Sequence, residues 1–290
     1  MRRLLAQPAA LGGLAMLAAL VAAAAAAGPL AHLMGQDPDA VDIAAILAPA
    51  SAAHPLGTDE VGRDFLLRLL QGGQVSLAIA AATALLAALI GTAVGIAAGY
   101  LGGVADALLM RLTDGVIALP LLPLLIVLGA LDPAKLGLPA DAFHSEIAGL
   151  VRTVVIIALV GWTTVARLVR AATLSVRIEE FVRAAEALGA GPGRIMRRHI
   201  LPNVLSPLIV ATMLSVGNII LLESALSFLG LGVQPPLPSW GNMLTAALEQ
   251  MTQAPAHAIW PGAMIFATVL AVNLLGDGLQ AALDPRAGRR

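Results

Sequence analysis

The chain has 290 residues, of which 59% are hydrophobic and only 12% are charged, whereas ordinary soluble domains are about a quarter charged. This composition predicts an integral membrane protein and excludes an ordinary soluble enzyme. The formal net charge of −1 gives no reason to expect a nucleic-acid partner. Because the chain has no cysteine, disulfides, thiolate nucleophiles and thiolate metal sites are excluded.

The first apolar stretch, residues 4–36, carries no acidic or basic group apart from His32. A hydrocarbon core needs about 20 apolar residues, so the stretch is long enough to cross it. The opening letters MRR followed by alanines also resemble a signal peptide. However, the apolar part of a signal peptide is usually about 7 to 15 residues long. The length therefore favours a retained first span.

The next segment, residues 37–74, is polar and mixed. It ends in Phe65, Leu66, Leu69 and Leu70, whose spacing predicts a short helix lying on the membrane surface. A metal or catalytic carboxylate site is conceivable beside it, but the interleaved arginines favour a solvated, self-paired face. The charged residues of this face are Asp59, Glu60, Arg63, Asp64 and Arg68.

Five further spans are predicted from uncharged stretches. They lie at residues 75–105, 115–131, 147–166, 203–222 and 259–276. Pro120 and Pro123 predict a kink in the third span, and Arg111 should pair with Asp114 just before it. A turn is expected at residues 100–103. The loop at 132–146 and the connector at 227–258, with Trp240 at the membrane interface, should lie between spans.

Residues 179–202, EEFVRAAEALGAGPGRIMRRHILP, form the longest polar interruption of the C-terminal half. Gly189 is placed to end one short helix and Pro192 to begin another, which Pro202 should then stop. Ala184 and Ala185 would give a face of small residues that another protein could approach closely. The alternative is a mere connector between spans. Basic residues predict a cytoplasmic loop; they are Arg183, Arg194, Arg197 and Arg198.

The distribution of positive charge predicts the orientation. With six spans and the N-terminus inside, thirteen arginines fall on the inner side, against three arginines and Lys135 outside. This bias favours cytoplasmic termini in a multi-pass protein. Lys135 is the only lysine of the chain, and it does not follow the glycine of a GxxxxGK[ST] loop, so ATP binding of that kind is not expected. No cofactor or metal site is predicted.

Three motifs resemble one family. They are HPLGTDEVGRDFLLRLLQGGQVSL (54–77), AAEALG followed by HILPN (184–203), and LSFLGLGVQPPLPSWGNML (226–244). Nearly the whole chain resembles permease subunits of bacterial ABC importers of the dipeptide, oligopeptide and nickel group. The resemblance implies an all-α, polytopic fold of the type I importer class with about six transmembrane helices. It also implies an N-terminal part at 1–72 and a core permease domain at 73–290, which holds a cytoplasmic loop at about 171–202.

The resemblance assigns roles to two sets of residues. In such permeases the cytoplasmic loop supplies a coupling helix to an ATPase subunit. The matching positions are Arg183, Ala184, Ala185, Leu188, Gly189, Ile195, Leu201 and Pro202. Arg183 stands where the family has glutamate, so no salt bridge can be inferred from that acid. The outer segment of the family corresponds to His54, Pro55, Leu56, Gly57, Thr58, Asp59, Gly62, Arg63 and Asp64.

The implied function is half of a translocation pathway in the bacterial inner membrane for peptides or a related solute such as a nickel chelate. The implied partners are a second permease subunit, two cytoplasmic ABC ATPases, an extracytoplasmic binding protein and membrane lipid. An ion-driven transporter is the alternative; its candidate acids Asp114, Glu223 and Asp277 lie near span ends, where solvated acids are expected. An intramembrane enzyme is less well supported, because there is no HExxH motif. His54, His144 and His257 fall in outer loops or at a span edge.

Overall fold

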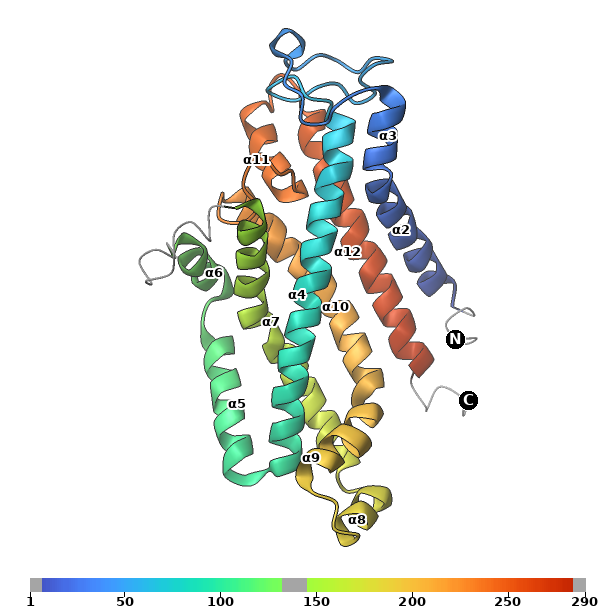
Figure 1. Cartoon of the computed structure of the whole chain (residues 1–290), viewed down its shortest axis with the longest axis vertical. Helices are drawn as coiled ribbons and strands as arrows, with labels where there is room; N and C mark the ends of the chain where they lie inside the picture. Colours follow the sequence, from blue (N-terminus) through green and yellow to red (C-terminus); the bar gives the residue numbers. More distant parts are fainter. Residues whose placement is uncertain (1–6, 132–144, 284–290) are drawn as a thin grey trace.

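The computed structural model describes residues 7–131 and 145–283, and every regular element in these ranges is helical. Long helices stand side by side, with loops at one end and two short helices at the other (Figure 1). Within these described ranges, five helices are long and apolar enough to cross a membrane, and a bent pair makes a sixth candidate. The helices are α2 (Pro8–Ala25), α3 (Ala27–Met34), α4 (Phe65–Leu101), α5 (Gly103–Ala118), α6 (Leu121–Ala130), α7 (Glu146–Val176), α8 (Glu180–Ala187), α9 (Pro192–Ile195), α10 (Leu201–Phe228), α11 (Trp240–Glu249) and α12 (Ala256–Leu283).

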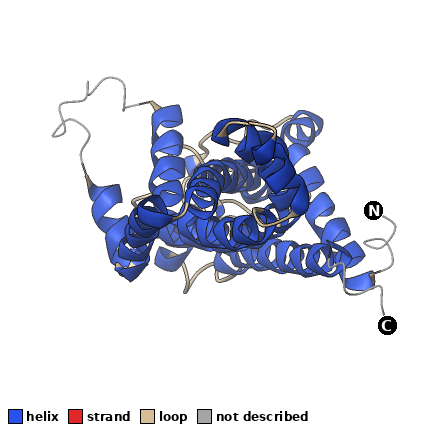
Figure 2. Cartoon of the chain, turned by 90° about the horizontal axis from the view of Figure 1, so that it is seen from below, coloured by secondary structure: helices blue, strands red, loops and turns tan. Residues whose placement is uncertain are grey.

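The first span is part of the helical bundle. Helix α2 packs against α12, and the contact is close because Gly13 has no side chain. A Cβ at this glycine would lie 2.7 Å from the carbonyl oxygen of Ala271. The start of α2 and the end of α12 lie at the same edge of the bundle (Figures 1 and 2).

The prediction of a short surface helix at residues 65–70 is wrong, because these residues form the first turns of α4. Asp64 caps this helix by accepting a hydrogen bond of 2.8 Å from the backbone N–H of Leu67. Phe65 and Leu69 are buried, each 3% exposed, so they contact the bundle and not the membrane surface. The helix continues without a break through Gly72 and Gly73 into the following span. The expected turn at residues 100–103 is confirmed: α4 ends at Leu101, and Gly102 has φ +65°.

Helix α4 packs closely on α7 through three glycines spaced four residues apart. Built onto Gly91, Gly95 and Gly99, a Cβ would lie 2.6 to 2.7 Å from atoms of α7. Small residues at this spacing let two transmembrane helices approach until their backbones nearly touch. The α4–α7 pair therefore forms the centre of the bundle. The GxxxGxxxG pattern of residues 91–99 is a signal for this contact in the sequence, but it lies outside the three motifs.

The predicted kink in the third span is confirmed. Helices α5 and α6 are bent by 87° across a short break, and Pro120 is the residue that precedes α6. The predicted pairing of Arg111 with Asp114 is wrong. Asp114 instead accepts a hydrogen bond of 2.6 Å from Arg167 of α7. The sequence pointed to the nearest arginine along the helix, but the tertiary contact with α7 supplies the partner.

The expectation that Pro202 stops a helix is also wrong. The helical path runs from Pro192 to Phe228 without a break. A π-helical turn at Met196–Ile200 precedes α10, and the N–H of Leu201 donates to the carbonyl of Met196, five residues back. Because Pro202 has no N–H, the wider turn before it lets the helix continue.

The division expected between residues 72 and 73 falls inside α4, which is continuous. The expected loop at residues 132–146 lies mostly outside the described residues, as do Lys135 and His144. Helix α7 begins where that loop was expected to end, with the Ser145 side chain accepting a hydrogen bond from the N–H of Ala148. Five predicted spans thus correspond to α2–α3, α4, α7, α10 and α12, and the sixth to the bent pair.

Candidate functional site

The motifs lie at opposite ends of the bundle. The outer segment, residues 54–64, and the connector that holds α11 are at one end, and α8 and α9 are at the other (Figure 1). The loop that contains α8 and α9 is called the coupling loop (residues 177–202).

The coupling loop has the predicted helix–bend–helix form. Helix α8 ends at Ala187, and Gly189 follows with φ +81°, a left-handed conformation that favours glycine. Pro192 opens α9, as its fixed φ suits the first turn of a helix. These positions agree with the prediction. Leu201 and Pro202 lie in the first turn of α10 instead of closing the loop.

The expected small-residue face is divided between two sides of α8. Ala185 is 9% exposed and Val182 is fully buried, so they face the bundle. Ala184 is exposed and Leu188 is 88% exposed. The prediction that Ala184 and Ala185 share a face is wrong, because consecutive helical residues point about 100° apart. The exposed surface near the bend is formed by Ala184, Leu188 and Gly189.

The loop is attached to the bundle at several points. Ile195 is fully buried and packs in a cluster with Val182, Ile200 and Val204. The hydroxyl group of Tyr100, at the end of α4, donates a hydrogen bond of 3.0 Å to Glu186 of α8. Arg177, where α7 leads into the loop, donates to the Gly99 carbonyl at 3.0 Å. The loop is thereby tied to α4, so a force on α8 would be transmitted to the long helices.

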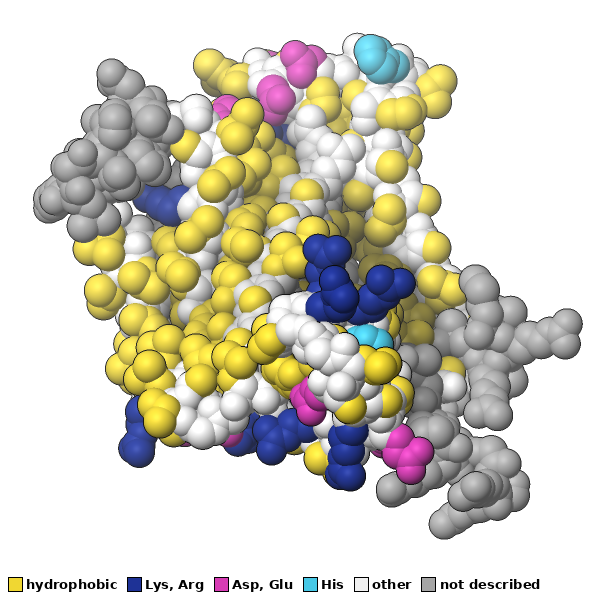
Figure 3. Space-filling model, turned by 60° about the horizontal axis from the view of Figure 1, so that its bottom comes forward, with side chains coloured by type: hydrophobic (Ala, Val, Ile, Leu, Met, Phe, Trp, Pro, Cys, Tyr) yellow, Lys and Arg dark blue, Asp and Glu magenta, His cyan; other side chains and the backbone are white. Residues whose placement is uncertain are grey.

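The coupling-loop end is strongly basic. Arginine side chains gather on the face that shows this end (Figure 3). Arg194, Arg197 and Arg198 line one hollow there and are exposed. Arg183, a residue of α8, is also exposed at this end.

The residues of the outer segment mainly fold the segment itself. Asp59 accepts hydrogen bonds from the backbone N–H groups of Val61 and Arg63, and it pairs with the Arg63 guanidinium at 2.7 Å. His54 contacts the capping carboxylate of Asp64 at 3.0 Å. The expected self-pairing is confirmed, but the expected solvation is wrong. Asp59, Asp64 and Arg68 are buried, at 5%, 3% and 5% exposed.

Tight turns explain other residues of this motif. Gly57 and Gly62 have φ of +81° and +82°. A Cβ on Gly62 would lie 1.8 Å from the carbonyl oxygen of Asp42, so only glycine fits. The Thr58 hydroxyl group accepts a hydrogen bond of 2.8 Å from Ala48 N–H and donates to the Ala45 carbonyl. Leu56 packs against the main hydrophobic core, and Pro55 follows His54 in the same loop.

The two outer motifs, far apart in sequence, form one structural unit. Arg68 donates to Asp39 at 2.6 Å and to the Pro236 carbonyl at 2.8 Å. Trp240 is 2% exposed, and its indole N–H donates to the Leu69 carbonyl at 3.1 Å. The expectation that Trp240 lies at the membrane interface is therefore wrong. It is a core residue, because α11 folds back across the start of α4.

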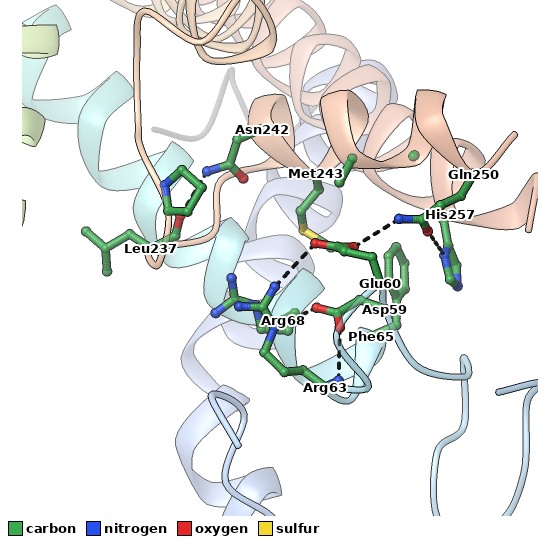
Figure 4. Close-up of a pocket in the computed structure, with 13 residues that line it drawn as sticks. Asp59, Glu60, Arg63, Phe65, Arg68, Leu237, Asn242, Met243, Gln250 and His257 are labelled. Carbon is green, nitrogen blue, oxygen red and sulfur yellow. Dashed lines mark hydrogen bonds and ion pairs between the residues drawn. The ribbon is translucent and has the colours of Figure 1, made fainter. Parts of the chain in front are cut away.

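A small cavity of about 110 Å³ lies inside this unit. Figure 4 shows its polar wall, where Gln250 donates to Glu60 at 3.2 Å and contacts His257 at 3.2 Å. The His257 ring stacks on Phe65 with 4.2 Å between the ring centroids. These contacts join the outer segment to α11 and α12. We call the whole unit, residues 37–64 with 229–250, the outer cap.

Glu223 was expected to be a solvated acid at a span end, and this is wrong. It is fully buried in α10. The Ser227 hydroxyl group donates to its carboxylate at 2.8 Å, and Val233 N–H donates to the same hydroxyl oxygen at 3.0 Å. Glu223 thus fixes the connector that leaves α10. Asp114 and Asp277 are exposed, as expected.

Comparison with known proteins decides the family. Residues 91–289 match the model of the binding-protein-dependent transport system inner membrane component. The chain belongs to this family. The matched region contains the coupling loop and the outer motif at residues 226–244, whereas the outer segment at residues 54–64 precedes it.

Individual relatives agree with this assignment. A Brucella suis protein that carries the name of a peptide permease is 40% identical over 252 residues, covering 86% of this chain and 79% of the relative. The Pseudomonas aeruginosa di/tripeptide transport system permease protein is 40% identical over 240 residues, covering 83% and 75%. The Pectobacterium atrosepticum glutathione transport system permease protein is 39% identical over 236 residues, covering 81% and 74%.

The chain is therefore an inner-membrane permease subunit of an ABC importer and not an enzyme. In such systems ATP is hydrolysed by a separate subunit, which agrees with the missing phosphate loop. The family match and the apolar helices together confirm the predicted family, the all-α polytopic fold and the location in the inner membrane. The family assignment gives no support to the ion-driven alternative.

Proposed function

We propose that this permease imports short peptides, from dipeptides to molecules of the size of glutathione. The observation that carries the proposal is the identity of about two fifths to relatives named for di- and tripeptides and for glutathione. None of these relatives is named for nickel, so the proposed cargo does not include nickel chelates. An extracytoplasmic binding protein would deliver the cargo to the outer cap.

The proposed assembly contains a second permease subunit and two cytoplasmic ATPases. The exposed surface of Ala184, Leu188 and Gly189 would dock into an ATPase cleft. Small residues let the cleft approach the α8 backbone, and Leu188 offers an apolar side chain that is 88% exposed. The bonds from the loop to α4 would then pass ATP-driven closure to the spans.

The proposed orientation places both termini and the coupling loop in the cytoplasm and the outer cap outside. The exposed arginines at the coupling-loop end support it, because positive loops are retained inside. Acidic residues of the outer cap, such as Asp39 and Glu60, lie at the opposite end.

Uptake of a labelled dipeptide tests the proposal. Cells that lack their own peptide permeases should take up the dipeptide when they express this chain with its partner subunits. They should not do so with any ATPase inactivated. The chain reconstituted alone should neither hydrolyse ATP nor transport, whereas uptake by the chain alone under a proton or sodium gradient would contradict the proposal.

A further inference from the structure

A hollow of about 440 Å³ lies between the bend joining α5 to α6, the middle of α7 and the half of α10 that leads to Phe228. None of the side chains that line it is ionisable, and four are polar: Thr163, Thr164, Ser215 and Asn218. Polar groups at this depth need an explanation, because hydrocarbon offers no hydrogen-bond partner.

Two of the four polar groups are satisfied within their own helices. The Thr163 hydroxyl group donates to the Val160 carbonyl at 3.0 Å, and the Ser215 hydroxyl group donates to the Ala211 carbonyl at 2.8 Å. Thr164 and Asn218 are exposed, and their side chains find no hydrogen-bond partner within residues 7–131 and 145–283. They therefore present a free hydroxyl group and a free carboxamide to the hollow.

Asn218 lies within the fifth predicted span, residues 203–222. Helix α10 continues from it to Phe228, which is about 15 Å further at 1.5 Å per residue. A carboxamide at this depth is costly against lipid. It must face water, a ligand or another protein.

The broken helix gives a second, independent sign of water. Helix α5 ends at Ala118, and the N–H of Leu119 makes only a 3.3 Å bond to the Val116 carbonyl. Pro120 has no N–H to offer. Backbone that departs from helix at membrane depth is tolerated where protein buries it or where it lines a water-filled cavity. Val116 and Leu119 line this same hollow.

We infer that this hollow is a stretch of the translocation pathway, in which Asn218 and Thr164 form hydrogen bonds with the amide groups of a passing peptide. A carboxamide both accepts from an N–H and donates to a C=O, so it matches a peptide group whatever the side chains. Because the lining has no charged group, binding at this contact would not depend on the net charge of the peptide. The inference about the cargo rests on the proposed function; the inference about the pathway does not.

Thiol labelling of the complete importer tests the pathway, and the natural absence of cysteine from this chain makes it clean. Thr164→Cys and Asn218→Cys are made in a complex whose other subunits carry no cysteine, in lipid nanodiscs that leave both faces open. The control is Phe266→Cys, because Phe266 is an exposed apolar residue in the middle of α12. A charged, water-soluble methanethiosulfonate should modify positions 164 and 218 several-fold faster than position 266. Rates equal to that of the control would show that lipid or the second permease covers the hollow, and would overturn the pathway.

The peptide contact is tested by substrate and by side chain together. Saturating dialanine with its binding protein should slow labelling at position 164 several-fold. N-methyl dialanine should be imported less well than dialanine by the wild type, and Asn218→Leu should reduce that difference. Restoration of the difference by Asn218→Gln would support a hydrogen bond. An unchanged difference in Asn218→Leu would overturn the contact, and absence of any dialanine uptake would overturn the peptide cargo while the labelling comparison still decides the pathway.

Discussion

The indole N–H of Trp240 donates to the carbonyl of Leu69 across 171 residues of sequence. The backbone N–H of Trp240 also donates a hydrogen bond of 3.2 Å to the Ser76 hydroxyl group, in α4. These bonds attach α11 to the start of α4 and so hold the outer cap on the bundle. The outer motifs of the family therefore lie together because they are two halves of one packing unit.

Trp240→Ala should destabilise the permease by about 3 to 5 kcal/mol, the usual cost of removing a buried aromatic side chain. Trp260→Ala should cost much less, since Trp260 is 38% exposed on α12. Unfolding of the purified permease in mixed micelles by added SDS measures both. Equal losses in the two variants would mean that Trp240 does not hold the cap.

Gly95→Ala should destabilise the contact of α4 with α7. The added Cβ would lie 2.6 Å from the Ala166 carbonyl oxygen, and overpacking of this kind costs about 1 to 3 kcal/mol. Gly115→Ala is the matched control in α5, because nothing lies within 4 Å of its Cβ position. The same SDS titration should show the control unchanged or slightly stabilised; an equal loss there would remove the close-packing explanation.

Asp106 of α5 forms an ion pair with Arg170 of α7, in which Arg170 Nη2 donates to Asp106 Oδ2 at 2.6 Å. This pair should join α5 to α7. Its side chains are 19% and 32% exposed, so solvent screening limits the pair to about 1 kcal/mol. Asp106→Arg should lower stability, and adding Arg170→Asp should restore part of the loss. Arg111→Ala should be neutral, since Arg111 makes no ion pair within the described parts of the chain. A double variant no better than the single one would show that the two charges are not coupled.

Labelling from outside tests the orientation. An impermeant thiol reagent on intact cells should modify Ala52→Cys, an exposed residue of the outer cap, and should spare Ala190→Cys in the coupling loop. After the cells are opened, both should react. Modification of position 190 in intact cells would reverse the proposed topology.

The sequence predicted the spans and the bend of the coupling loop because apolar run length, Gly189 and Pro192 act locally. It did not predict contacts between distant segments. Asp114 lies three residues from Arg111 but pairs with Arg167 on another helix. Glu223 was predicted to be a boundary residue because it precedes the connector at 227–258, and Trp240 because it lies within that connector. The connector folds back over the bundle, and both residues are buried. Ala185 was assigned to the docking face because a motif does not show which side of α8 the bundle covers.

If the coupling loop transmits the work of an ATPase through the exposed side of α8, a bulky side chain there should block docking and transport. Ala184→Trp places a bulky group on that side. Val104→Trp places the same group at the same end of the bundle, on a residue that is 85% exposed at the start of α5. Copurification of the ATPases and ATP-dependent dipeptide uptake are measured at equal membrane abundance. We expect Ala184→Trp to lose both and Val104→Trp to keep both; normal copurification and uptake in Ala184→Trp would show that the loop is only a connector.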